Sequence, residues 1–302
     1  IDMNQKKYEQ RGLAVGIIFN ILMGAAGIWV YHITQIEALF VDAYFTVIAV
    51  TSGVAAILIS KFSKKKSRKY PNGYFMLEPL YAIAKSSLSL GLLLMAVVNV
   101  SQKAFIYFSS GVGEQMNVGP IIPYEIIMVI LCFSLAWYYN RQNKRIQYVS
   151  TMLDAETKGI IIDGAMSAGI GIVAIVSAGI TQDSPLAFLL YTGDFFITVA
   201  LCIFTIREPL IVIKKSFIEL TGGVLIDKNI QATFENIISE HLPKTTMLNE
   251  YTIYKVGMSL RAEAEIKTNA KQLNTTELLD SKKEMAKQLS KEFEFVQIDF
   301  KF

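Results

Sequence analysis

Two aspartates, Asp42 and Asp163, each lie inside a stretch of sequence that is apolar enough to cross a lipid bilayer. A carboxylate at the centre of a bilayer costs about 2.5–3.5 kcal/mol on insertion scales, so such residues are rare and usually functional. Their common role is to hold a cation or a proton on its way through the membrane. The alternative is that each carboxyl group is neutral or hydrogen-bonded within a helical bundle. We favour the first interpretation, so the pair predicts a cation-transport site.

Helical spacing adds two neighbours to these aspartates. Thr46 follows Asp42 by four residues and shares its helix face. Glu156 precedes Asp163 by seven residues, which places it on the same face and about 10 Å nearer the membrane surface. Asp42 and Asp163 are the predicted metal ligands, Thr46 is a weaker candidate, and Glu156 is a weaker candidate on the access route. Hard oxygen ligands suit Mg, Mn or Ca, whereas imidazole or thiolate favours Zn or Cu.

Three other charged residues lie in or at the apolar stretches. Glu78 stands next to Pro79 at the start of the third stretch and is predicted to be a helix-end charge. Asp194 lies near the outer end of the sixth, where capping that helix is favoured over guarding an exit. Both are kept as candidates for either a pathway or a structural role. Lys85 lies two turns deeper than Glu78 and is predicted to pair with a carboxylate, more for structure than for function.

The remaining reactive side chains do not form a catalytic pattern. Cys132 and Cys202 lie in the fourth and sixth stretches, and their number excludes a disulfide framework. We interpret them as buried apolar thiols rather than metal ligands. His32 and His241 lie away from the membrane centre. No His-Glu-x-x-His, Ser/His or Cys/His constellation occurs in the apolar stretches. The chain is therefore predicted not to be an enzyme, and no prosthetic group is expected.

The elements that must position these residues follow from hydropathy. The chain has 302 residues, of which 52% are hydrophobic. A membrane span needs about 20 mostly apolar residues. An N-terminal secretory signal is not evident, and we expect the first apolar stretch to be part of the fold. Six stretches meet the length requirement, near residues 12–33, 37–60, 77–108, 121–139, 151–180 and 186–213.

Basic residues cluster on one side of these six spans. The positive-inside rule then places both termini in the cytoplasm. Because the basic excess is explained by topology, nucleic-acid binding is not expected. The clusters are Lys6, Lys7 and Arg11; Lys61, Lys64, Lys65, Lys66, Arg68 and Lys69; Arg141, Lys144 and Arg145; and Lys214 with Lys215.

The composition changes after Gly222-Gly223 to that of a small soluble unit. Asp227 and Asn274 are predicted helix caps. The strands are expected at Glu250–Met258, Leu260–Thr268 and Phe295 to Phe300. We therefore predict a transmembrane domain at 1–221 and a cytoplasmic α/β domain at 222–302, in the order α-β-β-α-β and ferredoxin- or metallochaperone-like. Such a small core often dimerises, and a homodimer is expected.

The ordered motifs of the chain resemble those of the cation diffusion facilitator family, which are proton-coupled exporters of divalent metals. The likeness extends over nearly the whole chain. Its motifs are Ala38-Leu39-x-x-Asp42-Ala43, Tyr70-Pro71-Asn72-Gly73-Tyr74 leading to Glu78, Ala155-Glu156 followed by Asp163 and Ser167, and Asp194 in the sixth span.

The resemblance implies a transport site built from two residues on each of the second and fifth spans. Transferred to this chain, the site retains Asp42 and Asp163. Thr46 stands where a second Asp is usual, and Gly159 stands where His or Asp is usual. Tyr74 replaces a common loop His. These departures count against zinc selectivity and leave open whether transport is retained.

The function predicted from the sequence is membrane cation efflux, by proton-coupled antiport of a divalent metal ion. The ion is unresolved among Zn, Mn, Fe and Mg. The expected partners are the ion, protons, a plasma (inner) membrane bilayer and a second copy of the chain. Two alternatives stay open. One is a transporter of monovalent cations or protons, and the other is a transport-inactive scaffold or sensor that acts through residues 222–302.

Overall fold

The structure, a computed structural model, describes residues 4–34, 37–113, 119–180, 185–243, 246–268 and 274–302. The side chains at 31, 33, 34, 37–45, 47, 48, 194 and 197 also lie outside the described part, although those residues belong to helices.

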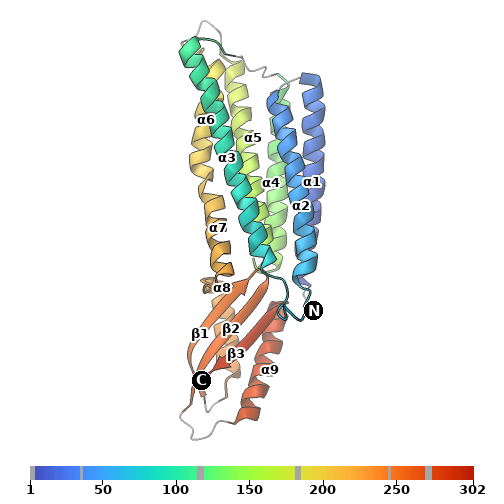
Figure 1. The fold of residues 1–302 in the computed structure, drawn as a ribbon, viewed down its shortest axis with the longest axis vertical. Coiled ribbons are helices and arrows are strands. Elements are labelled where there is room, and N and C mark those ends of the chain that lie inside the picture. The colour runs from blue at the N-terminus through green and yellow to red at the C-terminus, as the bar shows by residue number, and fades with distance from the viewer. Residues whose placement is uncertain (1–3, 35–36, 114–118, 181–184, 244–245, 269–273) are drawn as a thin grey trace.

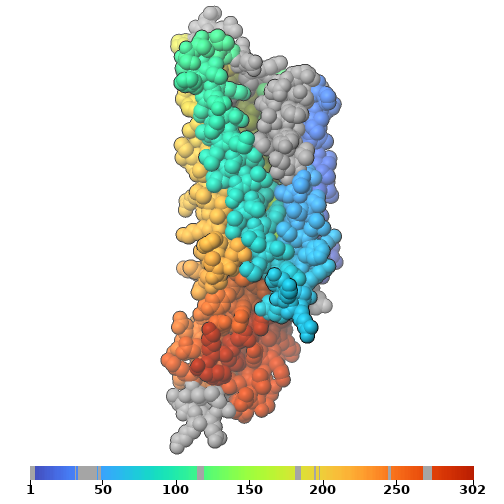
Figure 2. Space-filling model, in the orientation of Figure 1, coloured from blue at the N-terminus to red at the C-terminus, as the bar shows by residue number. Residues whose placement is uncertain are grey.

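Long helices form an extended bundle, and a small α/β unit lies at one end of it (Figure 1; Figure 2). Five apolar stretches of the described residues are long enough to cross a membrane, with α6 and α7 counted together. The remaining predicted span, the second, corresponds to α2, whose described part at Ala49–Ser63 is also apolar. The predicted α-helical membrane fold is thus confirmed. The helices are α1 (Gln5–Thr34), α2 (Glu37–Ser63), α3 (Leu77–Ser110), α4 (Ile121–Arg145), α5 (Thr151–Ala178), α6 (Leu189–Thr205) and α7 (Arg207–Leu220).

The sixth span is broken between α6 and α7, which the single predicted stretch 186–213 did not anticipate. Pro209 explains the break. Proline has no backbone N–H to donate to the carbonyl four residues earlier, here that of Thr205, and its ring crowds that carbonyl. The continuous helix therefore ends at Thr205, and α7 carries the chain on to Leu220.

Within the bundle, α1 packs along α2 and α4 packs along α5. A fully buried tyrosine, Tyr139 of α4, lies directly over Gly16 of α1. A Cβ atom at Gly16 would lie only 1.7 Å from the Tyr139 hydroxyl oxygen. The close approach of α1 and α4 therefore requires glycine at this position.

The α/β unit has the predicted element order. It comprises α8 (Lys228–His241), β1 (Thr246–Val256), β2 (Ser259–Thr268), α9 (Thr275–Glu292) and β3 (Val296–Lys301). The Asp227 carboxylate accepts hydrogen bonds from two backbone N–H groups at the start of α8, and Asn274 does the same for α9. Both predicted caps are confirmed. Strand β1 begins four residues before the predicted Glu250, because its pairing with β2 continues past an irregularity between Leu248 and Glu250.

Strand β2 is the centre of the sheet, antiparallel to β1 and parallel to β3. Its alternate residues Leu260, Ala262, Ala264 and Ile266 are buried in the core. The intervening positions are charged and pair across strands. Asp299 of β3 accepts a hydrogen bond from Lys282 and another from Arg261, and these partners lower the pKa of Asp299.

The α/β unit is tied to the bundle by a buried charged cluster, which we call the junction cluster, of Lys6, Glu9 and Glu78. The Lys6 Nζ lies 2.6 Å from Glu9 Oε1 and 2.5 Å from Glu78 Oε1, and none of the three side chains is exposed. The backbone N–H of Met258, in the β1–β2 turn, donates to Glu78 Oε2 at 2.9 Å. A single ammonium thus joins α1 to α3, and Glu78 joins α3 to the sheet.

Hydroxyl groups complete the junction cluster. Ser60 of α2 donates to Glu9 Oε1, and Ser150, the N-cap of α5, donates to Glu9 Oε2. Glu78 lies in the first turn of α3, as predicted, and its carboxylate is also fully buried. Lys6, one of the basic residues before the first predicted span, belongs to the first turn of α1, which the α/β unit covers.

Replacing Lys6 with Met leaves Glu9 and Glu78 buried without their cation. Removing one partner of a buried ion pair typically costs about 3–5 kcal/mol. We therefore expect Lys6→Met to lower the thermal unfolding temperature of the detergent-purified protein markedly. Lys7→Met is the matched control, because the neighbouring Lys7 is exposed. Equal unfolding temperatures for the two variants would contradict this role of the cluster.

Candidate functional site

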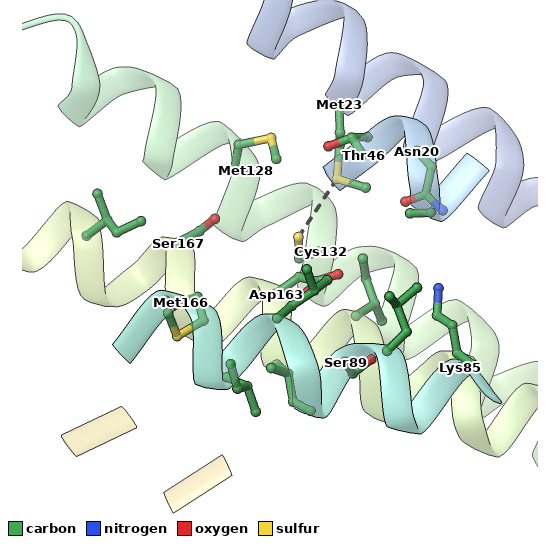
Figure 3. A pocket seen from close by; sticks show the side chains of 18 residues that line it. Asn20, Met23, Thr46, Lys85, Ser89, Met128, Cys132, Asp163, Met166 and Ser167 are labelled. Atoms are coloured by element: carbon green, nitrogen blue, oxygen red, sulfur yellow. Dashed lines mark hydrogen bonds between the residues drawn. The ribbon is translucent and has the colours of Figure 1, made fainter. Parts of the chain in front are cut away.

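A cavity of about 240 Å³ lies among α1, α2, α3, α4 and α5 (Figure 3). Its lining is mostly apolar, with a small set of polar and sulfur-containing side chains. These are Asn20 and Met23 of α1, Thr46 of α2, Lys85 and Ser89 of α3, Met128 and Cys132 of α4, and Asp163, Met166 and Ser167 of α5.

The cavity brings together two of the predicted ligands, Asp163 and Thr46, from helices that are far apart in sequence. The side chain of the third, Asp42, lies outside the described residues. Its backbone belongs to α2, one turn from Thr46 and on the same helix face. Asp194 belongs to α6, and its side chain is likewise outside the described part.

Only two charged residues are found among the described side chains that line this cavity, the acidic Asp163 and the basic Lys85. In Figure 3 they lie at different places along the cavity, with Ser89 labelled close to both. Oppositely charged groups in a region of low dielectric constant attract each other strongly, so each influences what the other can bind.

Glu156, which the sequence placed on an access route, lies next to this cavity without lining it. It is buried, and the Tyr81 hydroxyl donates a hydrogen bond to its Oε1. The Lys85 Nζ lies 3.7 Å from the same oxygen and donates to Ser52 Oγ at 3.0 Å. Lys85 therefore has the carboxylate partner that the sequence suggested, and that partner is Glu156.

Gly159 faces the Lys85 side chain. A Cβ atom at Gly159 would lie 3.6 Å from Lys85 Cε and 3.8 Å from Ser89 Oγ. The absence of a side chain on α5 at this level thus leaves the space through which the lysine stem of α3 passes.

Sulfur atoms form part of the cavity wall. Cys132 Sγ lies 3.8 Å from Met23 Sδ, and Met128 and Met166 also line the cavity. Cys132 is buried as predicted, but its place in the same cavity lining as Asp163 was not predicted. The available signal was the four-residue spacing of Met128 and Cys132, which puts two sulfur side chains on one helix face.

Glu125 is a carboxylate in a span that the sequence analysis did not single out. Glu125 is buried in α4, one turn from Met128. A Cβ atom at Gly171 of α5 would lie 3.3 Å from the Cβ atom of Glu125. The signal was the same as for Asp42 and Asp163, an acidic residue in an apolar stretch.

The described residues contain no group of three or more His, Cys, Asp or Glu side chains placed to hold a metal ion. The donors that the cavity does offer are one carboxylate, hydroxyl groups, the Asn20 amide, a thiol and thioethers. Such a set suits a single cation that keeps part of its own hydration shell.

Comparison with known families finds a match to the cation efflux transmembrane domain over residues 13–221. The matched region runs from α1 to the end of α7 and includes the whole cavity. No curated protein matches the chain.

The width of the cavity between α4 and α5 depends on Gly164. A Cβ atom there would lie 2.9 Å from Cys132 Cβ, closer than packed side chains allow. We expect Gly164→Ala to push the two helices apart and to destabilise the protein by about 1–3 kcal/mol. Gly91→Ala is the control, because a Cβ atom at Gly91 meets nothing within 4 Å. Thermal unfolding in detergent tests this, and equal stability of both variants would refute it.

Proposed function

Because this chain belongs to the cation diffusion facilitator family and is a cation efflux transporter of the membrane, we propose that it exports a divalent metal ion in exchange for protons. The cargo would bind in the cavity at Asp163, Thr46 and Asp42. The observation that carries this proposal is the convergence of Asp163 and Thr46, from α5 and α2, on one cavity within the bundle.

The mixture of donors in the cavity supports a transition metal as the cargo. Magnesium and calcium prefer shells made entirely of oxygen. Thiol and thioether ligands are softer and favour zinc, copper and related ions. The 3.8 Å between Cys132 Sγ and Met23 Sδ is roughly the edge of a tetrahedral site with metal–sulfur bonds of about 2.3 Å. The thiol and thioether groups of the cavity lining would thus act as the soft ligands in place of a histidine at position 159.

Proton exchange follows from the need to neutralise the carboxylates. In the loaded cavity the bound cation compensates the charge of each carboxylate. Once the ion departs, an ionised carboxylate in the lipid-shielded interior is energetically unfavourable unless another charge compensates it. Protons from the other side of the membrane satisfy this need and displace the ion. The cavity would open to the two sides in turn.

We further propose that the protein resides in the plasma (inner) membrane. Both termini and the α/β unit would lie on the cytoplasmic side. The basic loop between α2 and α3 lies at the same end of the bundle as the N-terminus and the α/β unit (Figure 1). The positive-inside rule places that end in the cytoplasm. Residues 222–302 would form a homodimer, because so small a unit has a limited core.

Asp163→Asn tests the cargo site. The substitution keeps the size of the side chain but removes its charge, so we expect metal efflux from proteoliposomes to fall by at least about tenfold. Asp154→Asn is the matched control, an acidic residue in the first turn of the same helix and outside the cavity lining. Full efflux by Asp163→Asn would exclude the proposed site.

Isothermal titration of the unaltered protein tests the two alternative functions. Absence of metal binding would favour a scaffold or sensor, and a preference for Na⁺ would favour a monovalent-cation transporter.

Cys132→Ser tests the contribution of sulfur to ion choice. Exchange of a thiol for a hydroxyl makes the site harder, so we expect the ratio of Zn²⁺ or Cd²⁺ efflux to Mn²⁺ efflux to fall by about fivefold or more. Cys202→Ser is the control, since Cys202 is also a buried thiol but lies in α6 away from the cavity lining. An unchanged ratio in Cys132→Ser would remove sulfur from the site.

A further inference from the structure

Lys85 occupies an unusual position between two carboxylates of one helix. Its Cε lies at the level of Gly159, 3.6 Å from where a Cβ atom would stand. Glu156 precedes Gly159 by three residues and Asp163 follows it by four, so their Cα atoms lie about 4.5 Å and 6 Å from that of Gly159 along the axis of α5, in opposite directions. Both residues share the helix face that Lys85 meets.

In the structure the ammonium group of Lys85 lies beside Glu156. It lies 3.7 Å from Glu156 Oε1 and donates to Ser52 Oγ. The Lys85 side chain is 11% exposed and that of Glu156 is 5% exposed, and Lys85 itself lines the cavity. A lysine stem has four rotatable carbons, so rotation about its terminal bonds carries the ammonium from the Glu156 side towards Asp163.

The surroundings of Glu156 allow the ammonium to leave. The Tyr81 hydroxyl also donates to Glu156 Oε1, so this carboxylate keeps a hydrogen-bond donor when Lys85 moves. The junction cluster is different, because the side chains of Lys6, Glu9 and Glu78 are all fully buried and the ammonium of Lys6 contacts both carboxylates. Lys85 is the basic residue among the described cavity-lining side chains, so it is the one placed to exchange partners.

We propose that Lys85 is a tethered cation that pairs with Glu156 when the cavity holds its cargo and with Asp163 when the cavity is empty. This inference rests on the proposed role of Asp163 as a cargo ligand and adds a step to it. The ammonium replaces the departed ion, so the empty cavity stays electrically balanced while it returns across the membrane. Lys85 thus determines the rate at which the empty cavity returns, and fewer protons are needed for each exported ion.

If Lys85 acts in this way, its replacement affects two kinds of transport differently, whereas loss of a structural lysine would affect both alike. Exchange of labelled for unlabelled cargo needs only the loaded cavity to change sides, whereas net efflux also needs the empty cavity to return. For Lys85→Gln in proteoliposomes loaded with Zn²⁺, we expect net efflux to fall by at least about tenfold and exchange to stay within about twofold of the unaltered protein. Lys158→Gln is the control, a partly exposed lysine of α5 paired with Glu208 at 2.7 Å.

A second variant makes an opposite prediction for affinity. Lys85→Gln removes a competitor for Asp163, so the half-saturating Zn²⁺ concentration should fall. Glu156→Gln removes the partner that holds Lys85 away from Asp163, so that concentration should rise by about fivefold or more. The double variant Lys85→Gln/Glu156→Gln restores the local charge balance and serves where a single variant fails to fold. It should keep exchange and lose net efflux.

Two results with the Lys85 variants would overturn the proposal. Net efflux and exchange that fall together in Lys85→Gln and in the double variant would show that the lysine is merely structural and overturn the proposal. Unchanged net efflux in a folded Lys85→Gln protein would overturn it too. Failure of the proposed function looks different, because Asp163→Asn would then retain both net efflux and exchange whatever the Lys85 variants do.

Discussion

Neutralisation of charge within the bundle is the constraint on which the arrangement of this protein depends. An ion that moves from water into an interior of low dielectric constant loses several kcal/mol of solvation, so a buried charge needs an opposite charge or strong hydrogen-bond donors. The junction cluster meets this need with one ammonium, two hydroxyls and a backbone amide. Lys85, Tyr81 and Glu156 meet it a few turns further into the bundle. The three charged side chains of the first group are fully buried, whereas Lys85 of the second group lines the cavity.

The same constraint explains how the α/β unit is attached. The β1–β2 turn reaches Glu78 through the Met258 amide. The first turn of α1 reaches the backbone carbonyl of Glu292, the last residue of α9, and the Glu294 carboxylate just beyond that helix. A tilt of α1 or α3 relative to the sheet would break these hydrogen bonds. Movements of the α/β unit and of the ends of these helices are therefore coupled. Lys6 and Glu78 contact residues 222–302 directly, whereas the cavity begins two turns deeper, at Lys85.

Most of the fold could be predicted from the sequence because its determinants are local. The spans follow from runs of apolar residues, and the helix caps at Asp227 and Asn274 are read within three residues. Pro209 was equally visible and marks the break before α7. Burial of Lys6 and Glu9 could not be predicted, because it depends on the return of a segment about 288 residues away in sequence. No local pattern distinguishes a lysine that such a segment covers from the exposed Lys7 beside it.

The site divides in the same way. Helical spacing placed Asp42 with Thr46 and Asp163 with Glu156, and the described cavity contains Thr46 and Asp163. The partner of Lys85 and the position of Cys132 depend on how α3, α4 and α1 rotate against their neighbours. That rotation is set by close contacts such as Gly16 with Tyr139, which one sequence does not display as a pair.

Gly159 and Lys85 are best understood as one feature. A methyl group at position 159 would make an ordinary 3.6 Å contact with Lys85 Cε, but a carboxylate or imidazole there would need the space that the lysine stem fills. A ligand on α5 at this level and an ammonium from α3 are therefore alternative ways of furnishing the cavity. The first adds a donor and holds the ion more tightly. The second removes a donor and adds a positive charge, which would weaken the binding of a cation in the cavity and leave a positive charge there after the cation departs.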